Sequence, residues 1–211
     1  MNKVLKYLFF VMFVKPLVYV GLGLNVRNPE LIPRKGPAII AANHNSHIDT
    51  LILMSLFPMR RIFDIHPVAA ADYFLNTKCK KWFFLNIFEI IPIFRTEVMK
   101  RNPFEKIDEK LKENKIIIVY PEGTRGEPEV ISDFKCGIAH IAKQNPDIPI
   151  IPVYMSGPGK VLPKDEGLLV PFICDVFIGE AMFGTEDKKE FTTNLKQKIE
   201  EMKTLYEKGE K

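Results

Sequence analysis

Short apolar runs alternate with amphipathic segments along most of the chain. Runs of about five residues between prolines, glycines or polar residues are typical of strands buried on both faces of a sheet. Such runs cover residues 38–42, 67–71, 90–94, 116–120, 148–155 and 172–178. Helical spacing covers residues 49–57, 104–114 and 138–142. This alternation predicts an α/β fold whose mixed, largely parallel sheet is flanked by helices.

The N-terminal segment is strongly apolar. Across residues 7–24 the only charge is Lys15, which is followed by Pro16. A charge and a helix breaker are both costly inside a bilayer, so we expect two short helices that meet at Pro16 and lie in the membrane interface. A single membrane span and a helix buried against the domain are the alternatives. The cations expected at lipid headgroups are Lys3, Lys6, Lys15 and Arg27.

The C-terminal segment is charged but has one apolar helical face. That face is formed by Phe191, Leu195, Ile199, Met202 and Leu205. It predicts an amphipathic helix packed on the body of the protein. We therefore divide the chain into a membrane-associating segment (1–26), an α/β domain (27–185) and a C-terminal helix (186–211).

Composition excludes several classes of protein. With 211 residues, 46% hydrophobic and 27% charged, the chain is neither disordered nor a polytopic membrane protein. A formal charge of +4 suits an anionic membrane or a phosphorylated ligand but does not indicate nucleic-acid binding. The three cysteines form no CxxC pair, which indicates a reducing compartment without a zinc site or a disulfide framework.

The turn at residues 43–49 carries the first candidate chemistry. It lies between an apolar run and a helical segment, and it contains His44 and Asp49. If a helix begins between them, the Asp49 carboxylate reaches back to Nδ1 of His44 and leaves Nε2 free as a general base. Ser46 is a weaker candidate nucleophile, for which a helix-capping role is favoured. The same residue types also allow a metal site made by His44, His47 and Asp49.

The second candidate site, at residues 121–125, also follows an apolar run. Gly123 allows a close backbone approach or a positive φ, and Arg125 offers a planar fork for phosphate or carboxylate. Glu122 either accepts a hydrogen bond from a ligand hydroxyl or orients Arg125. A tight turn with a surface ion pair is the structural alternative. No GxGxxG pattern occurs, so nucleotide binding has no support.

A basic and aromatic cluster lies between these two sites. Its lysines are Lys78, Lys80 and Lys81, and Trp82, Phe83 and Phe84 follow directly. Cations beside aromatic side chains are typical of a membrane interface. A helix whose aromatic residues fill the core fits the pattern equally well.

Four segments together resemble the glycerolipid acyltransferases of the 1-acylglycerol-3-phosphate acyltransferase type. The first family block is matched by Asn43, His44 and Asp49, and the third by residues 121–125 without substitution. An apolar strand ending at Arg95 is similar to the second block, and residues 150–153 to the fourth. Order and spacing agree from about residue 25 to about residue 180.

The resemblance implies an O-acyltransferase that moves an acyl chain from a thioester to a lysolipid hydroxyl. His44, oriented by Asp49, would act as general base. The acceptor would be held by Glu122, Gly123, Thr124 and Arg125, with Arg95 assisting. The family needs no metal and no bound cofactor. The donor would be acyl-ACP or acyl-CoA, the other partners would be membrane lipids, and the location would be the cytoplasmic face of a membrane.

One departure from the family pattern concerns the acceptor. A lysine is expected before the second block, but residues 68–72 place Ala70 there. Losing a cation weakens the case for 1-acylglycerol-3-phosphate, so a different lysolipid is the alternative acceptor. Lys78, Lys80 or Lys81 are candidates to replace the missing charge. The residues are also compatible with a metal-dependent hydrolase, or with a membrane-binding module without turnover.

Overall fold

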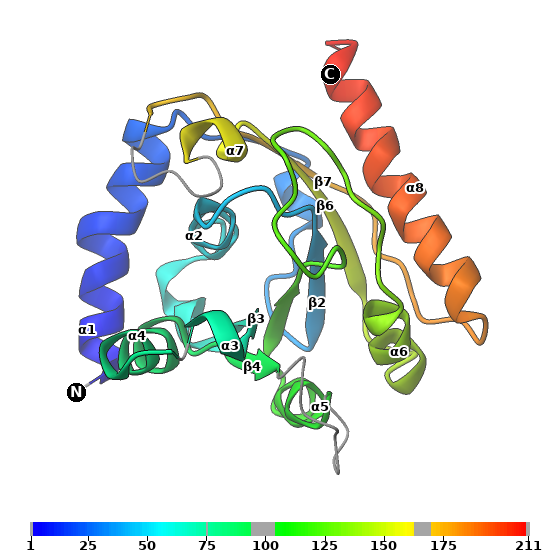
Figure 1. Ribbon diagram of the computed structural model, residues 1–211, viewed down its shortest axis with the longest axis horizontal. Helices are drawn as coiled ribbons and strands as arrows, with labels where there is room; N and C mark the ends of the chain where they lie inside the picture. The colour runs from blue at the N-terminus through cyan, green and yellow to red at the C-terminus, as the bar shows by residue number, and fades with distance from the viewer. Residues whose placement is uncertain (1, 75, 94–103, 163–169, 210–211) are drawn as a thin grey trace.

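The computed structural model describes residues 2–74, 76–93, 104–162 and 170–209 (Figure 1). Their strands form one seven-stranded sheet in the order β1-β7-β6-β2-β5-β3-β4. The strands are β1 (Asn25–Arg27), β2 (Ala38–Ala42), β3 (Ile65–Ala70), β4 (Ile91–Ile93), β5 (Ile116–Val119), β6 (Ile150–Ser156) and β7 (Asp175–Ile178). The sheet is mixed and mostly parallel, because among the strands of the described residues β6 and β7 pair in antiparallel fashion and the other pairs are parallel. This confirms the predicted fold class.

Helices cover both faces of the sheet, which explains why the central strands are apolar throughout (Figure 1). One face carries the N-terminal helix, α2 (Ile48–Ser55), α4 (Lys78–Phe83) and η5 (Phe84–Phe88). The other face carries α5 (Glu105–Lys112), α6 (Gly137–Gln144) and α8 (Lys188–Glu207). The shorter elements are η3 (Pro29–Leu31), η4 (Met59–Asp64), α3 (Ala71–Phe74) and α7 (Pro158–Val161).

The register of the sheet brings two loops together. β2 pairs in parallel with β5, with Ile39 opposite Ile117 and Ala41 opposite Val119. Parallel strands have their carboxyl ends at the same edge. The turn after β2 and the long loop after β5 therefore leave the sheet side by side.

The N-terminal segment is one continuous helix rather than two that meet at Pro16. It consists of α1 (Asn2–Phe9), the π-helical segments η1 (Phe10–Val14) and η2 (Leu17–Gly21), and helical residues 15 and 16 between them. Pro16 has helical dihedral angles. A proline ring clashes with the carbonyl four residues earlier. The wider π turn that precedes it, closed by Lys15 N–H to Phe10 O, lets the helix continue.

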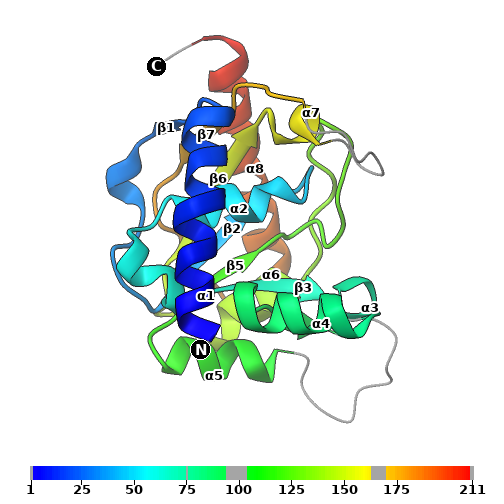
Figure 2. The same cartoon turned by 90° about the vertical axis from the view of Figure 1, so that its left-hand side faces the viewer.

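This helix has one buried face and one exposed apolar face. Phe10, Val14, Val18 and Leu22 enter the core shared with the sheet and α2. Phe13 and Val20, on the outside, are 63% and 84% exposed. Figure 2 shows the helix lying along the body, with α4 beside its beginning. Burial against the domain was only an alternative in the sequence prediction. It holds for one face of the helix.

Lys6 does not project towards a headgroup. Its side chain is fully buried, with 0% exposure, and Nζ lies 2.8 Å from Glu89 Oε2. The ammonium also lies 5.8 Å from the centroid of the Phe63 ring. Arg27 differs from its prediction as well, because it stacks on Phe177 at 4.6 Å. An ion pair whose ammonium is buried thus attaches the helix to the body.

Two more segments differ locally from the sequence prediction, and a third combines features of its two alternatives. Asn25–Arg27, at the predicted boundary between the membrane-associating segment and the α/β domain, forms β1 and pairs with β7. Leu205 is exposed, and Tyr206 packs on the core instead. In the basic and aromatic cluster, Phe83 and Phe84 pack on the core while Trp82 and the lysines are mainly exposed.

We expect the two halves of the Lys6–Glu89 pair to respond differently to mutation. Glu89→Gln leaves the buried Lys6 ammonium without a counter-charge and should lower the free energy of unfolding by about 2 kcal/mol. Lys6→Met should cost less than about 1 kcal/mol, since the Glu89 side chain is 29% exposed and can be hydrated. Guanidinium denaturation measures the unfolding free energy of both variants. A larger loss for Lys6→Met than for Glu89→Gln would contradict the conclusion that Lys6 is the buried charge that needs its partner.

Candidate active site

The site is built where the turn after β2 meets the loop after β5. The backbone N–H of Gly126 donates to His44 O at 2.8 Å, and the N–H of His44 donates to Glu122 Oε1 at 2.8 Å. Gly126 and Glu122 come from the loop, and His44 from the turn. The two candidate sites found in the sequence are therefore one site.

The structure brings His44 and Asp49 into direct contact. Nδ1 of His44 lies 2.9 Å from Asp49 Oδ2. The same oxygen accepts the backbone N–H groups of Asn45 and Ser46 at 2.8 and 2.9 Å. Because an ionised carboxylate only accepts, Nδ1 carries the hydrogen of this contact, and in the neutral imidazole the lone pair then lies on Nε2. The imidazole remains partly open, with its side chain 16% exposed, whereas Asp49 is buried.

Tyr120 fixes the plane of the imidazole. Its ring stacks on His44 with the centroids 3.9 Å apart and the planes within 15°. Its hydroxyl lies 2.8 Å from Thr50 Oγ1 on α2. Burial raises the pKa of Tyr120 well above its usual value, with the Asp49 charge as a second cause, so the phenol stays neutral. Sequence reasoning missed this role, and only its place beside the 121–125 motif hinted at it.

Asn43 ties the turn to β6. Its Nδ2 donates to Met155 O at 2.9 Å, and its Oδ1 accepts the Met155 N–H at 2.7 Å. Nδ2 also donates to Asn45 Oδ1 at 2.9 Å. A side-chain amide that satisfies both backbone groups of a neighbouring strand holds the beginning of the turn rigidly.

Ser46 and His47 have other partners. The Ser46 hydroxyl donates to Leu162 O at 2.8 Å and accepts the Ile48 N–H at 3.3 Å, as a residue at the beginning of a helix does. The His47 ring lies 5.8 Å from the Phe74 ring. Across the described ranges of the chain, no three His, Cys, Asp or Glu residues are grouped so that they could hold a metal ion.

Glu122 is placed differently from the expectation that it contacts a ligand. It is only 2% exposed. One oxygen accepts the His44 N–H, and the other accepts the Ser132 N–H at 2.9 Å. Burial raises the pKa of the Glu122 carboxyl, and the backbone N–H donors oppose that rise. Glu122 thus connects the turn to both ends of the loop.

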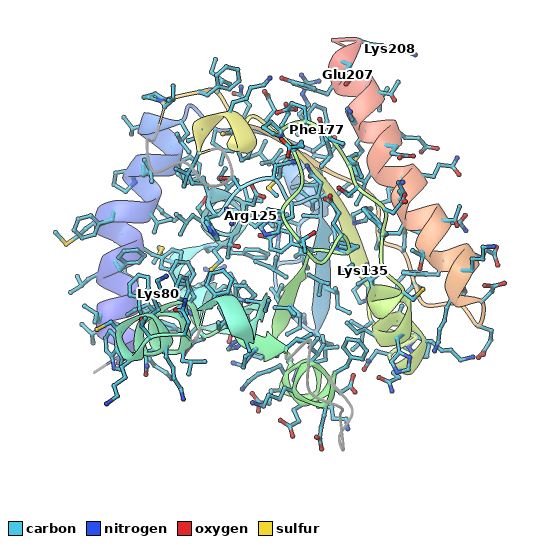
Figure 3. All side chains as sticks on the ribbon, viewed as in Figure 1. Lys80, Arg125, Lys135, Phe177, Glu207 and Lys208 are labelled. Atoms are coloured by element: carbon cyan, nitrogen blue, oxygen red, sulfur yellow. The ribbon has the colours of Figure 1, made fainter. Side chains whose placement is uncertain are left out.

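The remaining predicted binding residues follow Glu122. Gly123 has φ of +74°, a conformation that favours glycine, and its N–H donates to Tyr120 O at 3.0 Å. Thr124 is exposed and Arg125 is half-buried. Arg125 lies near the centre of the view in Figure 3. Arg95 lies outside the described residues.

A second carboxylate, Glu129, holds the far part of the loop. Its Oε2 accepts the Ser156 hydroxyl at 2.7 Å, and its Oε1 accepts the Gly157 N–H at 2.9 Å. Both partners lie at the carboxyl end of β6. No sequence motif marked Glu129, because its role depends on which strand the loop crosses.

Comparison with known proteins identifies the family. A family model described as "Acyltransferase" matches residues 23–156, which include both the turn and the 121–125 motif. The chain belongs to this acyltransferase family. The match covers more than half of the chain.

Relatives within the acyltransferase family carry related names. The human 1-acyl-sn-glycerol-3-phosphate acyltransferase beta is 28% identical over 68% of this chain and 50% of its own length. A probable 1-acyl-sn-glycerol-3-phosphate acyltransferase of Mycoplasma pneumoniae is 24% identical over 88% of this chain and 73% of its own. The chain thus spans about half of the human relative.

A solved acyltransferase shares the fold. The crystal structure of the 1-acyl-sn-glycerophosphate (LPA) acyltransferase PlsC from Thermotoga maritima aligns with a TM-score of 0.72 and 19% identity, over 98% of both chains. The likeness therefore extends over nearly the whole chain, including the N-terminal helix and α8.

We expect Glu122→Gln to impair acyl transfer by displacing His44. Glutamine has one acceptor oxygen, so either the His44 or the Ser132 N–H would face an amide NH2 group, at a cost of about 2 kcal/mol in unfolding free energy. The kcat should fall on the order of tenfold, while the acceptor KM stays near that of the wild type. A raised acceptor KM with unchanged kcat would instead support direct contact between Glu122 and the acceptor.

Proposed function

We propose that this protein is an O-acyltransferase that moves a fatty acyl chain from a thioester to the free hydroxyl of a lysolipid. The proposed acceptor is 1-acylglycerol-3-phosphate, and the product is phosphatidate. One observation carries the proposal: within a domain of the acyltransferase family, Asp49 Oδ2 lies 2.9 Å from Nδ1 of His44, which leaves Nε2 as the nitrogen that can take a proton from a substrate.

The proposed reaction begins with proton transfer to His44. Nε2 takes the proton of the acceptor hydroxyl as its oxygen attacks the thioester carbonyl carbon. The tetrahedral intermediate collapses, the carbon–sulfur bond breaks, and the imidazolium returns the proton to the leaving thiolate. Asp49 stabilises the imidazolium and keeps the ring in the required tautomer. The ester bond replaces the thioester bond, so the step needs no other reactant.

A thioester is already activated, so direct attack is sufficient and no covalent enzyme intermediate is required. The engagement of Ser46 supports this proposal, because its hydroxyl donates to Leu162 O. The reaction needs no metal or bound cofactor, and acyl-ACP or acyl-CoA is consumed as a substrate. Stacking on Tyr120 holds the imidazole without taking part in proton transfer.

In the proposed acceptor site, Arg125 binds the phosphate through its guanidinium. Gly123 and Thr124 line the same turn, and the prediction that Arg95 assists is retained. Glu122 is proposed as a positioning residue, since both its oxygens accept backbone N–H groups. Because Ala70 stands where the family pattern has a lysine, a different lysolipid remains the second candidate acceptor.

The metal-dependent hydrolase has less support. His47, which would complete a site with His44 and Asp49, lies against Phe74. Stoichiometric zinc or manganese in the purified protein would favour this alternative.

The protein is proposed to act at the cytoplasmic face of a membrane, with its N-terminal helix in the interface. Residues 3–21 are long and apolar enough to cross a bilayer. However, the buried face of this helix packs along the α/β body, so a spanning helix would draw the body into the hydrocarbon. The outer face suits an interface better. Its exposed side chains include Val4, Leu8, Met12, Phe13, Tyr19 and Val20.

The decisive test is acyl transfer from a labelled thioester to a panel of lysolipids with and without phosphate. The wild type should form phosphatidate from 1-acylglycerol-3-phosphate. His44→Ala should reduce kcat by at least about a thousandfold, because the general base is lost. Circular dichroism and vesicle binding should be unchanged. Activity of His44→Ala near that of the wild type would end the general-base assignment.

Membrane binding should depend on the outer face of the helix alone. Phe13→Ser with Val20→Ser removes two exposed apolar side chains without touching the core, and should weaken binding to anionic vesicles on the order of tenfold. Phe183→Ser is a matched control, since Phe183 is 53% exposed on another part of the surface. Equal loss in both variants, measured by flotation, would argue against this face.

A further inference from the structure

The acceptor proposed above carries more charge than one arginine balances. A phosphate monoester has a charge of about −1.5 to −2 near pH 7. Arg125 supplies one positive charge, and Ala70 supplies none where the family pattern predicts a lysine. A second cation at the same edge of the sheet would balance the remaining charge.

Lys135 lies at this place. It comes just before α6, and its backbone N–H donates to Pro121 O at 2.9 Å, which brings the end of the loop back to its beginning. Its side chain runs along Gly123. Cδ, Cε and Nζ lie 3.0, 3.2 and 3.3 Å from the point that a β-carbon at Gly123 would occupy. Glycine at 123 therefore leaves room for the lysine as well as allowing the positive φ.

Two carboxylates in the same loop as Lys135 have other partners. Asp133 pairs with Lys196 at 2.6 Å. Glu122 accepts the backbone N–H groups of His44 and Ser132. Within the part of the chain that the structure describes, Nζ of Lys135 makes no ion pair or hydrogen bond, and the residue is exposed. Its charge is thus available to an anion.

The strand register relates Lys135 to the missing lysine. β3 pairs in parallel with β5, with Pro67 opposite Ile118. Continuing this register brings Ala70, at the end of β3, and Pro121, just after β5, to the same edge of the sheet. Lys135 is hydrogen-bonded to Pro121. Lys135, a cation from the loop after β5, thus lies at the same edge of the sheet as position 70.

We infer that Lys135 is a specificity-determining residue that binds the acceptor phosphate together with Arg125. Its ammonium supplies the second positive charge at the Gly123 turn, and it makes a lysine at position 70 unnecessary. The inference rests on the proposed function. It makes a phosphorylated lysolipid the preferred acceptor despite Ala70.

Other lysines are less suitable. Lys160 lies 3.9 Å from Glu129 and over the Phe172 ring at 5.0 Å, so a carboxylate already shares its charge. Lys78, Lys80 and Lys81 lie on α4, which packs beside the N-terminal helix. Figure 3 places Lys80 beside that helix and Lys135 beside the beginning of α6.

The test compares Lys135→Met with Lys208→Met. Both remove one positive charge, but Lys208 lies at the far end of α8 (Figure 3). Lys135→Met should raise the KM for 1-acylglycerol-3-phosphate on the order of tenfold and leave the donor KM unchanged. With monoacylglycerol as acceptor the two variants should behave alike. Lys135→Arg, which keeps the charge, should retain most of the wild-type affinity.

Three results would overturn the inference. The first is an equal acceptor KM in the two methionine variants. The second is a rise in the KM for monoacylglycerol as large as that for 1-acylglycerol-3-phosphate. The third is a rise in the donor KM alone, which would place Lys135 on a donor phosphate. Arg125→Ala gives the comparison for a loss of the other cation, and should also raise the acceptor KM more than the donor KM.

A binding measurement separates this inference from the proposed function. If the wild type transfers no acyl chain to any acceptor, the proposed function fails, but binding to phosphatidylcholine vesicles with and without lysophosphatidate still tests Lys135. The gain in binding caused by lysophosphatidate should be present in the wild type and Lys208→Met and absent in Lys135→Met. The same gain in all three would refute the role of Lys135.

Discussion

A single buried carboxylate holds the two halves of the site together. Glu122 comes from the loop after β5, and its oxygens accept N–H groups from His44, in the turn after β2, and from Ser132, at the far end of its own loop. Both charged and neutral forms of a buried carboxyl are costly without partners. Two backbone donors stabilise the charged form of the Glu122 carboxylate. The bond to the His44 N–H also fixes the position of the His44 backbone.

The same principle is applied to Asp49. Its Oδ2 accepts the imidazole Nδ1–H and two backbone N–H groups, so the carboxylate that orients the His44 ring is itself oriented by the turn. Rigid support of this kind keeps a general base within the narrow range of positions that catalysis requires. The parallel pairing of β2 with β5 underlies the contact between Glu122 and His44, because it determines which loops meet.

The N-terminal helix serves the body and its surroundings through different faces. Its inner side chains complete a core cluster, and Lys6 is fixed to Glu89 at 2.8 Å, while its outer side chains leave an apolar surface uncovered. Such a surface on a protein of ordinary charge content calls for a hydrophobic partner. Under the proposed function, this helix would bring the site on the attached body near lipid substrates.

The sequence by itself determined the fold class, the spacing that lets Asp49 reach His44, and the glycine turn before Arg125, because these depend on local periodicity and on neighbours in the chain. It did not determine β1 or the course of the chain at Pro16, since both depend on packing partners. Tertiary structure alone decided that Glu122 faces inward and that Lys135 lies against Gly123, because contacts between distant segments follow from strand register, which no local pattern encodes.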